Sequence, residues 1–110
     1  MGNGVACNLR SRNAKLKQIY RRKDGYCWYC GVKLSFTNYG TGCLKGAWEV
    51  DHRRPRSRGG SDDIKNLVPI CYYCNREKGN RLGGTFRAHI KRNWSSMRAY
   101  HAAMRRKYSP

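Results

Sequence analysis

Apolar residues recur at helical spacing near the beginning of the chain. Between Asn8 and Asp24 they fall at helical intervals, and basic residues occupy the other positions. Such spacing places the apolar side chains on one side of a helix, and Gly25 is a residue type that ends helices. We therefore predict a basic helix at about 8–24. Its apolar positions are Leu9, Leu16, Ile19 and Tyr20.

A similar apolar stripe runs along the last part of the chain. It begins after the flexible pair Gly83-Gly84, and Thr85 is a residue type that favours the start of a helix. We predict a second basic helix at about 85–107, with its apolar stripe packed in the core. The stripe consists of Phe86, Ile90, Trp94, Met97, His101, Met104 and Tyr108.

The middle of the chain has the pattern of strands and turns. Trp48 to His52 and Leu67 to Ile70 are predicted as two short strands, and a proline in the second suits an edge. A loop, 53–66, joins them and is marked by Pro55, Gly59-Gly60 and Ser61-Asp62-Asp63. Tyr72 to Lys78 is predicted as a short helix that ends at Gly79. The predicted order is strand, long loop, strand and short helix.

The chain is strongly basic. It carries 24 lysine and arginine residues against 6 aspartate and glutamate residues, a formal net charge of +18. Such an excess favours nucleic acid as a partner, because neutralising phosphates releases counterions. A generic basic protein, such as a ribosomal component, is equally compatible with this charge alone. We expect an intracellular protein, in the cytoplasm or nucleoid, because no apolar run approaches the ~20 residues of a membrane span.

Four of the six cysteines form two Cys-x-x-Cys pairs. Each pair presents two thiolates on a tight turn, and four such ligands make a closed tetrahedral zinc site. We expect this Zn²⁺ to be structural, contributing on the order of 10 kcal/mol to the folding of a chain with a thin core. Disulfide pairing is the alternative, and Cys7 and Cys43 have no assigned role. The predicted zinc ligands are Cys27, Cys30, Cys71 and Cys74.

Further motifs lie between and after these pairs. The sequence reads Glu49-Val50-Asp51-His52, then Asn66-Leu67, and then Cys71-Tyr72-Tyr73-Cys74-Asn75-Arg76-Glu77-Lys78. In type and order they closely resemble the HNH endonuclease family, whose pattern is Asp-His, Asn-Leu and Cys-x-x-Cys-Asn-x-x-Lys. The resemblance runs from Cys27 to about Arg81. It implies an α+β fold in one domain, 1–110: a small ββα-metal (His-Me finger) core at about 26–82 with a structural four-cysteine zinc site, flanked by N- and C-terminal helices.

The resemblance implies a metal-dependent endonuclease that hydrolyses phosphodiester bonds in DNA, by nicking or double-strand cleavage. His52 would be the general base, because an imidazole is partly neutral and still basic near neutral pH. Asp51 and Asn75 would hold the catalytic cation, Mg²⁺ or another divalent ion such as Mn²⁺, since hard cations prefer oxygen ligands. Asn66 would fix the loop that orients His52.

The pair Asp51-His52 raises a geometric difficulty. Strict alternation along a strand would direct the two side chains to opposite faces, where they could not serve one phosphate. We therefore expect the strand to end or distort at His52, immediately before Arg53 and Arg54.

Basic residues beside the predicted site are candidates for phosphate contacts, so we expect DNA binding that depends strongly on salt. For Arg76 and Lys78, a solvated pair with Glu77 is the alternative. A homodimer on DNA, a phage packaging partner, and a phage or mobile-element origin are all compatible with the resemblance. The alternative functions are a non-catalytic, zinc-containing nucleic-acid-binding protein and a ribosome-associated zinc protein that binds RNA. The predicted DNA-binding residues are Arg53, Arg54, Arg56, Arg58, Arg76 and Lys78.

Overall fold

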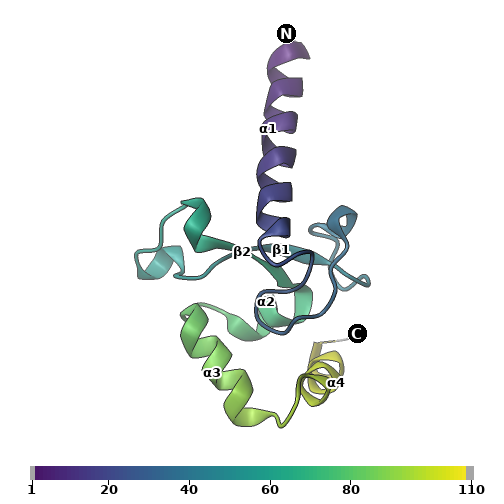
Figure 1. The fold of residues 1–110 in the computed structure, drawn as a ribbon, viewed down its shortest axis with the longest axis vertical. Helices are drawn as coiled ribbons and strands as arrows, with labels where there is room; N and C mark the ends of the chain where they lie inside the picture. The colour runs from purple at the N-terminus through teal and green to yellow at the C-terminus, as the bar shows by residue number, and fades with distance from the viewer. Residues whose placement is uncertain (1, 109–110) are drawn as a thin grey trace.

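The structure is a computed structural model that describes the backbone of residues 2–108 and the side chains of residues 12–108. It is an α+β protein in which two strands are followed by a short helix and framed by longer helices (Figure 1). The helices and strands are α1 (Gly2–Arg21), β1 (Trp48–His52), β2 (Leu67–Cys71), α2 (Tyr72–Lys78), α3 (Gly83–Asn93) and α4 (Met97–Tyr108). Single 3-10 turns lie at Phe36–Asn38, Arg56–Arg58 and Ile64–Asn66.

The two strands form one antiparallel sheet. They pair from Trp48 opposite Cys71 to His52 opposite Leu67, and every residue of β2 is buried. The outer edge of β2 is covered near its proline, because the backbone N–H of Trp28 donates to the carbonyl oxygen of Pro69 at 2.9 Å. Both predicted strands are confirmed, β1 ends at His52 as expected, and α2 has the predicted bounds.

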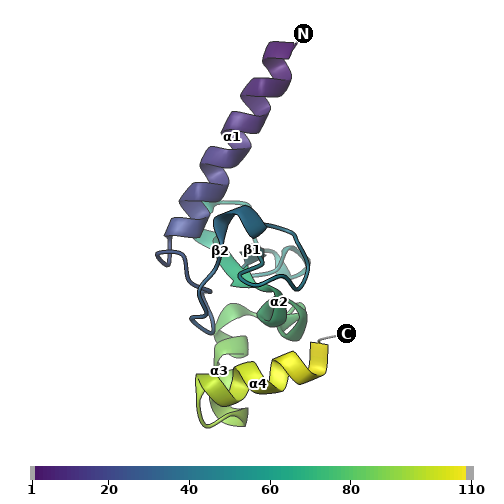
Figure 2. The same cartoon turned by 90° about the vertical axis from the view of Figure 1, so that its right-hand side faces the viewer.

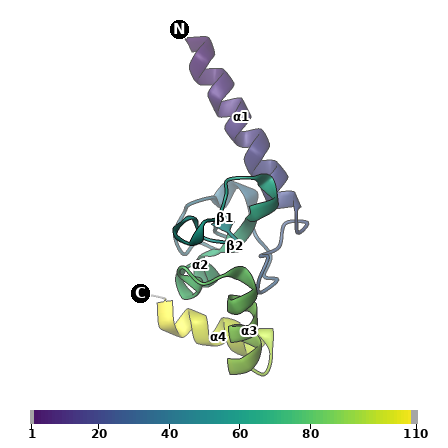
Figure 3. The ribbon, with the colours of Figure 1, turned by 90° about the vertical axis from the view of Figure 1, so that its left-hand side faces the viewer.

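Helix α1 projects from the body of the molecule, and only its C-terminal turns pack against the sheet. The three ribbon views agree on this arrangement (Figures 1, 2 and 3), and the longest extent of the molecule is 53 Å. Ile19 is 1% exposed, whereas Arg12 and Lys15 are exposed. The helix ends close to the predicted position; the side chains of Leu9 and Cys7 lie outside the described residues. In the described part of the chain, no helix combines the length and apolar character needed to cross a membrane.

The core is built on Trp48, which is fully buried at the start of β1. Its ring contacts those of Tyr20, Phe36 and Tyr39, at centroid distances of 5.4, 6.0 and 4.9 Å. Aromatic rings with tilted and edge-on contacts fill space efficiently. A single tryptophan therefore joins α1, the loop before β1 and the sheet.

The predicted single helix at 85–107 is wrong, because the structure has two helices at this place. Trp94 is extended (φ −135°, ψ 136°) and ends α3. The hydroxyl of Ser96 then accepts a hydrogen bond from the backbone N–H of Ala99 at 3.1 Å, which caps the start of α4. After this break the buried residues of α4 are Tyr100 and Met104, while Met97, assigned to the stripe, is 38% exposed.

Glu77 ties α2 to both C-terminal helices. Its carboxylate, 7% exposed, accepts hydrogen bonds from Lys107 at 2.8 Å, from the Tyr108 hydroxyl at 2.7 Å and from His89 at 3.1 Å. Burial opposes the charge of this carboxylate, but these three donors outweigh it and lower the pKa of Glu77 to about 2. We call these four residues the Glu77 network.

Candidate active site

Asp51 is a buried carboxylate held by two donors. It lies in β1, is 8% exposed, and accepts a hydrogen bond at Oδ2 from the hydroxyl of Tyr29 at 2.7 Å. Lys78 of α2 places its Nζ 3.2 Å from Oδ1 and 3.2 Å from the backbone oxygen of His52. Burial raises the pKa of Asp51 above its ordinary value, and the Tyr29 and Lys78 contacts oppose that rise. A negative charge is therefore costly at this position and needs both partners.

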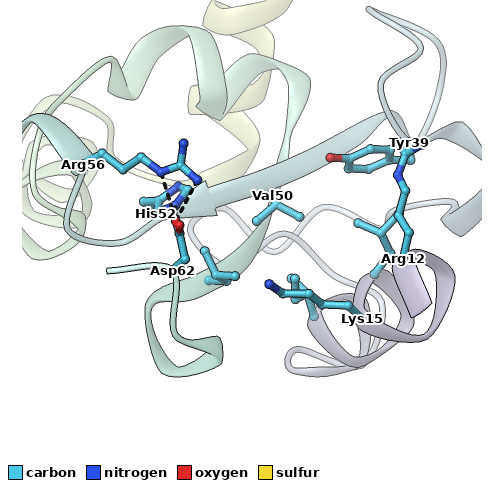
Figure 4. A pocket seen from close by; sticks show the side chains of 10 residues that line it. Arg12, Lys15, Tyr39, Val50, His52, Arg56 and Asp62 are labelled. Atoms are coloured by element: carbon cyan, nitrogen blue, oxygen red, sulfur yellow. Dashed lines mark hydrogen bonds and ion pairs between the residues drawn. The ribbon is translucent and has the colours of Figure 1, made fainter. Parts of the chain in front are cut away.

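His52 ends β1 and is held from the opposite side. Its Nε2 lies 2.8 Å from Oδ1 of Asp62, and the same oxygen accepts a hydrogen bond from Arg56 at 2.9 Å (Figure 4). Hydrogen bonds from His52 and Arg56 lower the pKa of Asp62, so its carboxylate is charged near neutral pH. Because an ionised carboxylate can only accept, Nε2 of His52 donates to Asp62, so a neutral imidazole carries its proton on Nε2 and its lone pair on Nδ1.

The loop 53–66, which carries Asp62, is fixed by side-chain to backbone hydrogen bonds. Asn66 accepts from the backbone N–H of Arg54 at 2.9 Å and donates to the carbonyl oxygens of Arg54 and Ser61 at 3.0 and 2.8 Å. Gly60 passes so close to Arg54 that a Cβ there would lie 1.7 Å from its carbonyl oxygen. The ends of this loop are therefore joined beside His52.

Asn75 lies on the exposed face of α2, next to a cavity of about 330 Å³ that we call the active-site cavity. Three residues predicted to act in catalysis, Asp51, His52 and Asn75, line this cavity, although Asp51 and His52 are adjacent in β1. The residues that line it include Val50, Asp51, His52, Arg56, Asn75 and Lys78.

The structure corrects the predicted role of Lys78 as an outer phosphate contact. Its side chain is 1% exposed and pairs with Asp51, so its ammonium neutralises a buried carboxylate and is not presented to the surface. The solvated pair with Glu77 is not formed either. The other predicted DNA-binding residues, Arg53, Arg54, Arg56, Arg58 and Arg76, are all exposed.

Several of these arginines also have partners within the chain. Arg56 is bonded to Asp62, Arg58 donates to the carbonyl oxygen of Asn80 at 2.7 Å, and Arg76 lies over the rings of Tyr72 and Tyr108. These contacts use part of each guanidinium, which has five N–H donors, and leave others for phosphate.

The four cysteines of the two pairs meet in one buried cluster, which we call the cysteine cluster (Cys27, Cys30, Cys71 and Cys74). Their sulfur atoms all lie within 4.8 Å of one another, and all four are free thiols and not disulfides. A tetrahedral ion with bonds of about 2.3 Å to sulfur needs sulfur atoms about 3.8 Å apart. The sulfur atoms of Cys30 and Cys71 are 3.7 Å apart. The cluster therefore fits a tetrahedral metal ion.

Hydrogen bonds to sulfur favour the thiolate form that a metal ion needs. The backbone N–H of Cys71 lies 3.4 Å from the sulfur of Cys27, and that of Cys74 lies 3.3 Å from the sulfur of Cys71. The hydroxyl of Tyr100 in α4 is 3.0 Å from the sulfur of Cys74. Burial raises the pKa of Cys27, but hydrogen bonds from the other three cysteines outweigh it and hold this pKa well below its usual value. The neighbouring cysteines and burial raise the pKa of Cys30, and burial with the same neighbours raises the pKa of Cys74, so the first thiolate of the cluster forms on Cys27.

Two antiparallel strands, a helix that follows them directly and a histidine at the end of the first strand define the ββα-metal class of protein. The model of the HNH endonuclease family matches residues 27–81, half of the chain, and the chain belongs to this family. Among curated proteins, the CRISPR-associated endonuclease Cas9 of Corynebacterium diphtheriae is similar, with 38% identity over 64 residues. The similar region is 57% of this chain and 5% of that relative. No solved structure matches the chain.

Three residues of the site were not predicted from the sequence. The hydroxyl of Tyr29 contacts Asp51, and the hydroxyl of Tyr100 contacts the cysteine cluster. The third residue, Asp62, contacts His52. Tyrosines within apolar patterns are usually taken as packing residues, so their hydroxyl contacts left no signal in the spacing. For Asp62 a signal exists, since it is an acidic residue in the glycine-containing turn 59–63, ten residues after His52.

Proposed function

We propose that this chain is a metal-dependent endonuclease that hydrolyses phosphodiester bonds in DNA, by nicking or by cutting both strands. One observation supports this most strongly: His52, Asp51 and Asn75 line a single open cavity beside exposed arginines. A base and two oxygen ligands around one opening are what metal-assisted attack of water on a phosphate needs.

His52 is the proposed general base. The carboxylate of Asp62 holds Nε2, so the proton of the attacking water passes to Nδ1. Asp62 also stabilises the imidazolium that forms, because its charge lies 2.8 Å from Nε2. Asn66 is proposed to position this histidine, since it joins the ends of the loop that carries Asp62.

Asp51 and Asn75 are the proposed ligands of the catalytic cation, Mg²⁺ or Mn²⁺. A carboxylate and an amide oxygen suit a hard cation and leave room for water and phosphate oxygens. When bound, the cation supplies positive charge to the phosphoryl group and the leaving oxygen. Tyr29 and Lys78 lower the cost of a negative charge on the buried Asp51, and so favour the carboxylate form that a cation needs.

The cysteine cluster is proposed to hold a structural Zn²⁺. Its four thiols are buried and mutually close, and a site closed by four protein ligands has no position for substrate. This ion would join the turn that contains Cys27 and Cys30 to the start of α2, and so keep Asn75 near β1.

DNA is the proposed substrate because of the charge and its location. The formal net charge is +18, and exposed arginines of the loop 53–66 lie beside His52. Phosphate contacts of this kind bind DNA of any sequence and weaken with salt. One observation favours a non-catalytic binding protein instead: both carboxylate oxygens of Asp51 already have partners.

The test is cleavage of supercoiled plasmid by the zinc-loaded chain with Mg²⁺ or Mn²⁺, and with chelator. His52→Ala should lower the rate by roughly 10²–10⁴-fold, the usual contribution of a general base. DNA binding, measured in parallel, should be retained. Nicked circles would indicate single-strand cutting, and linear plasmid would indicate cleavage of both strands.

A matched control is Asp63→Asn, which removes an exposed carboxylate outside the active-site cavity and should leave the rate unchanged. If the wild-type chain binds plasmid but cuts none of it with any divalent cation, the binding function replaces the nuclease. Equal rates for wild type and His52→Ala would rule out His52 as the base.

A further inference from the structure

A second hollow lies beside His52, between β1 and the projecting helix α1. Its volume is about 300 Å³, and Figure 4 shows the side chains that line it. Helix α1 contributes Arg12 and Lys15, and the segment before β1 contributes Tyr39. We call this hollow the α1 groove.

The α1 groove adjoins the active-site cavity. Val50, His52 and Arg56 line both hollows, so His52 stands between them at the end of β1. A DNA strand with a phosphate against His52 would have the active-site cavity on one side of that phosphate and the α1 groove on the other. The groove therefore continues the surface on which the proposed substrate lies.

Among the described residues, the positive charges that α1 brings to the groove have no acidic partner on that helix. Arg12 and Lys15 are exposed, and residues 12–23 of the chain include no aspartate or glutamate. The acidic side chain in the lining is Asp62, and its carboxylate is already bonded to Arg56 and His52. The charge at the α1 side is thus free for a polyanion.

The floor of the groove is apolar, and an aromatic ring stands at its side. Leu16, Ile19 and Val50 line the hollow, and the guanidinium of Arg12 lies 5.8 Å from the centre of the Tyr39 ring. These features match the parts of a nucleotide: sugars and bases pack against apolar side chains and aromatic rings, and phosphates pair with cations. A free inorganic anion would use only the cations.

We propose that the α1 groove binds the strand that is cut, on one side of the scissile phosphate, with Arg12 and Lys15 contacting its phosphates. This rests on the proposed function, because His52 marks the point of cleavage. Helix α1 would then be part of the substrate-binding site, and the face with Arg12 and Lys15 would contact the DNA. The opposite face of the helix, with Lys17 and Arg21, lines a separate hollow.

The first test measures DNA binding in a His52→Ala background, so that cleavage does not interfere. Affinity for a short labelled duplex is followed by fluorescence anisotropy over a range of salt concentrations. Each phosphate contact contributes about 0.9 to the slope of log affinity against log salt, so Arg12→Ala with Lys15→Ala should flatten it by about 1.8. Lys17→Ala with Arg21→Ala removes the same charge from the opposite face and should change the slope less.

A second test locates the strand. The photo-crosslinker p-benzoylphenylalanine replaces Lys15 in one variant and Lys17 in another, and crosslinked nucleotides are mapped relative to the cut. Position 15 should give crosslinks on one side of the cleavage point, a few nucleotides away, and position 17 should not. Equal slopes for the two double variants, or scattered crosslinks from position 15, would overturn the proposal.

The two proposals fail in distinguishable ways. Cleavage by the wild-type chain together with equal slopes would leave the nuclease and remove the groove. If the chain cuts nothing, p-benzoylphenylalanine in place of His52 supplies the reference point in the crosslinking test. A flattened slope, together with crosslinks from position 15 on one side of the nucleotide crosslinked from position 52, would then leave a DNA-binding groove without catalysis.

Discussion

Replacing Lys78 by methionine tests the buried pair at the centre of the candidate site. The side chains of Lys78 and Asp51 are 1% and 10% exposed, so methionine keeps the packing volume but leaves a buried carboxylate without its cation. Breaking such a pair costs about 3–5 kcal/mol of unfolding free energy. The remaining hydrogen bond from Tyr29 places the expected loss near the lower value, about 3 kcal/mol.

The loss should depend on pH in a definite direction. Burial already raises the pKa of Asp51, and removing the opposing charge of Lys78 raises it further. Between the ordinary pKa of 3.8 and this raised value, the folded state binds more protons than the unfolded state. The stability of Lys78→Met should therefore fall as the pH rises through that window, so the loss is larger near neutral pH than in mild acid.

The assay is urea denaturation of the zinc-loaded chain, without other divalent cations, at several pH values. Asp51→Asn combined with Lys78→Met should recover most of the lost stability, because no buried charge is left unpaired. A Lys78→Met protein as stable as wild type near neutral pH would refute this account of the pair. A loss that is the same at every pH would show that lost packing, and not charge, is responsible.

Two further predictions concern what holds the fold together. Chelating the proposed zinc, or replacing Cys71 by serine, should unfold the chain, because such an ion contributes on the order of 10 kcal/mol; circular dichroism that is unchanged by the chelator would contradict this. Glu77→Gln should lower the free energy of unfolding by about 1–3 kcal/mol in urea denaturation near neutral pH. The control Glu49→Gln should lower it little. The Glu77 contribution is complete above its ordinary pKa of 4.5 and is lost as the pH falls toward about 2, so an equal loss in acid would contradict it.

The sequence predicted the part of the fold in which local patterns and tertiary contacts agree. The strand Trp48–His52 and the helix Tyr72–Lys78 have the predicted bounds, and the apolar run Leu67–Ile70 was predicted as the second strand, which the structure extends to Cys71. The spacing of the cysteine pairs predicted that they would meet. In each case the same few neighbouring residues determine both the element and its place.

The C-terminal helix was mispredicted because helical spacing continues across the break. Trp94 and Met97 fit one helical stripe. However, the hydroxyl of Ser96 caps the start of a new helix, and the chain turns at this point. The turn brings Tyr100 to the cysteine cluster and Lys107 to Glu77, two contacts between segments far apart in sequence. Such long-range contacts are not visible in the spacing of neighbouring residues.

Lys78 was misplaced for a related reason. A lysine on a short helix is normally solvated, and only a buried anion justifies burying it. That anion, Asp51, comes from a different strand, so the pair exists only once α2 has packed on the sheet. The resemblance to the HNH family predicted that Asp51, His52 and Asn75 share one site, and all three line the active-site cavity. The partners Tyr29 and Asp62 depend on how the turns fold and were not predicted.

The Glu77 network has a consequence for where this domain can be shortened. Helix α2 is only seven residues long, too short to persist alone in water. Its Glu77 is held by hydrogen bonds from residues 89, 107 and 108, which lie beyond residue 81, where the family match ends. A fragment trimmed to that match would contain Asp51, His52 and Asn75 but would lack the contacts that hold α2 against α3 and α4.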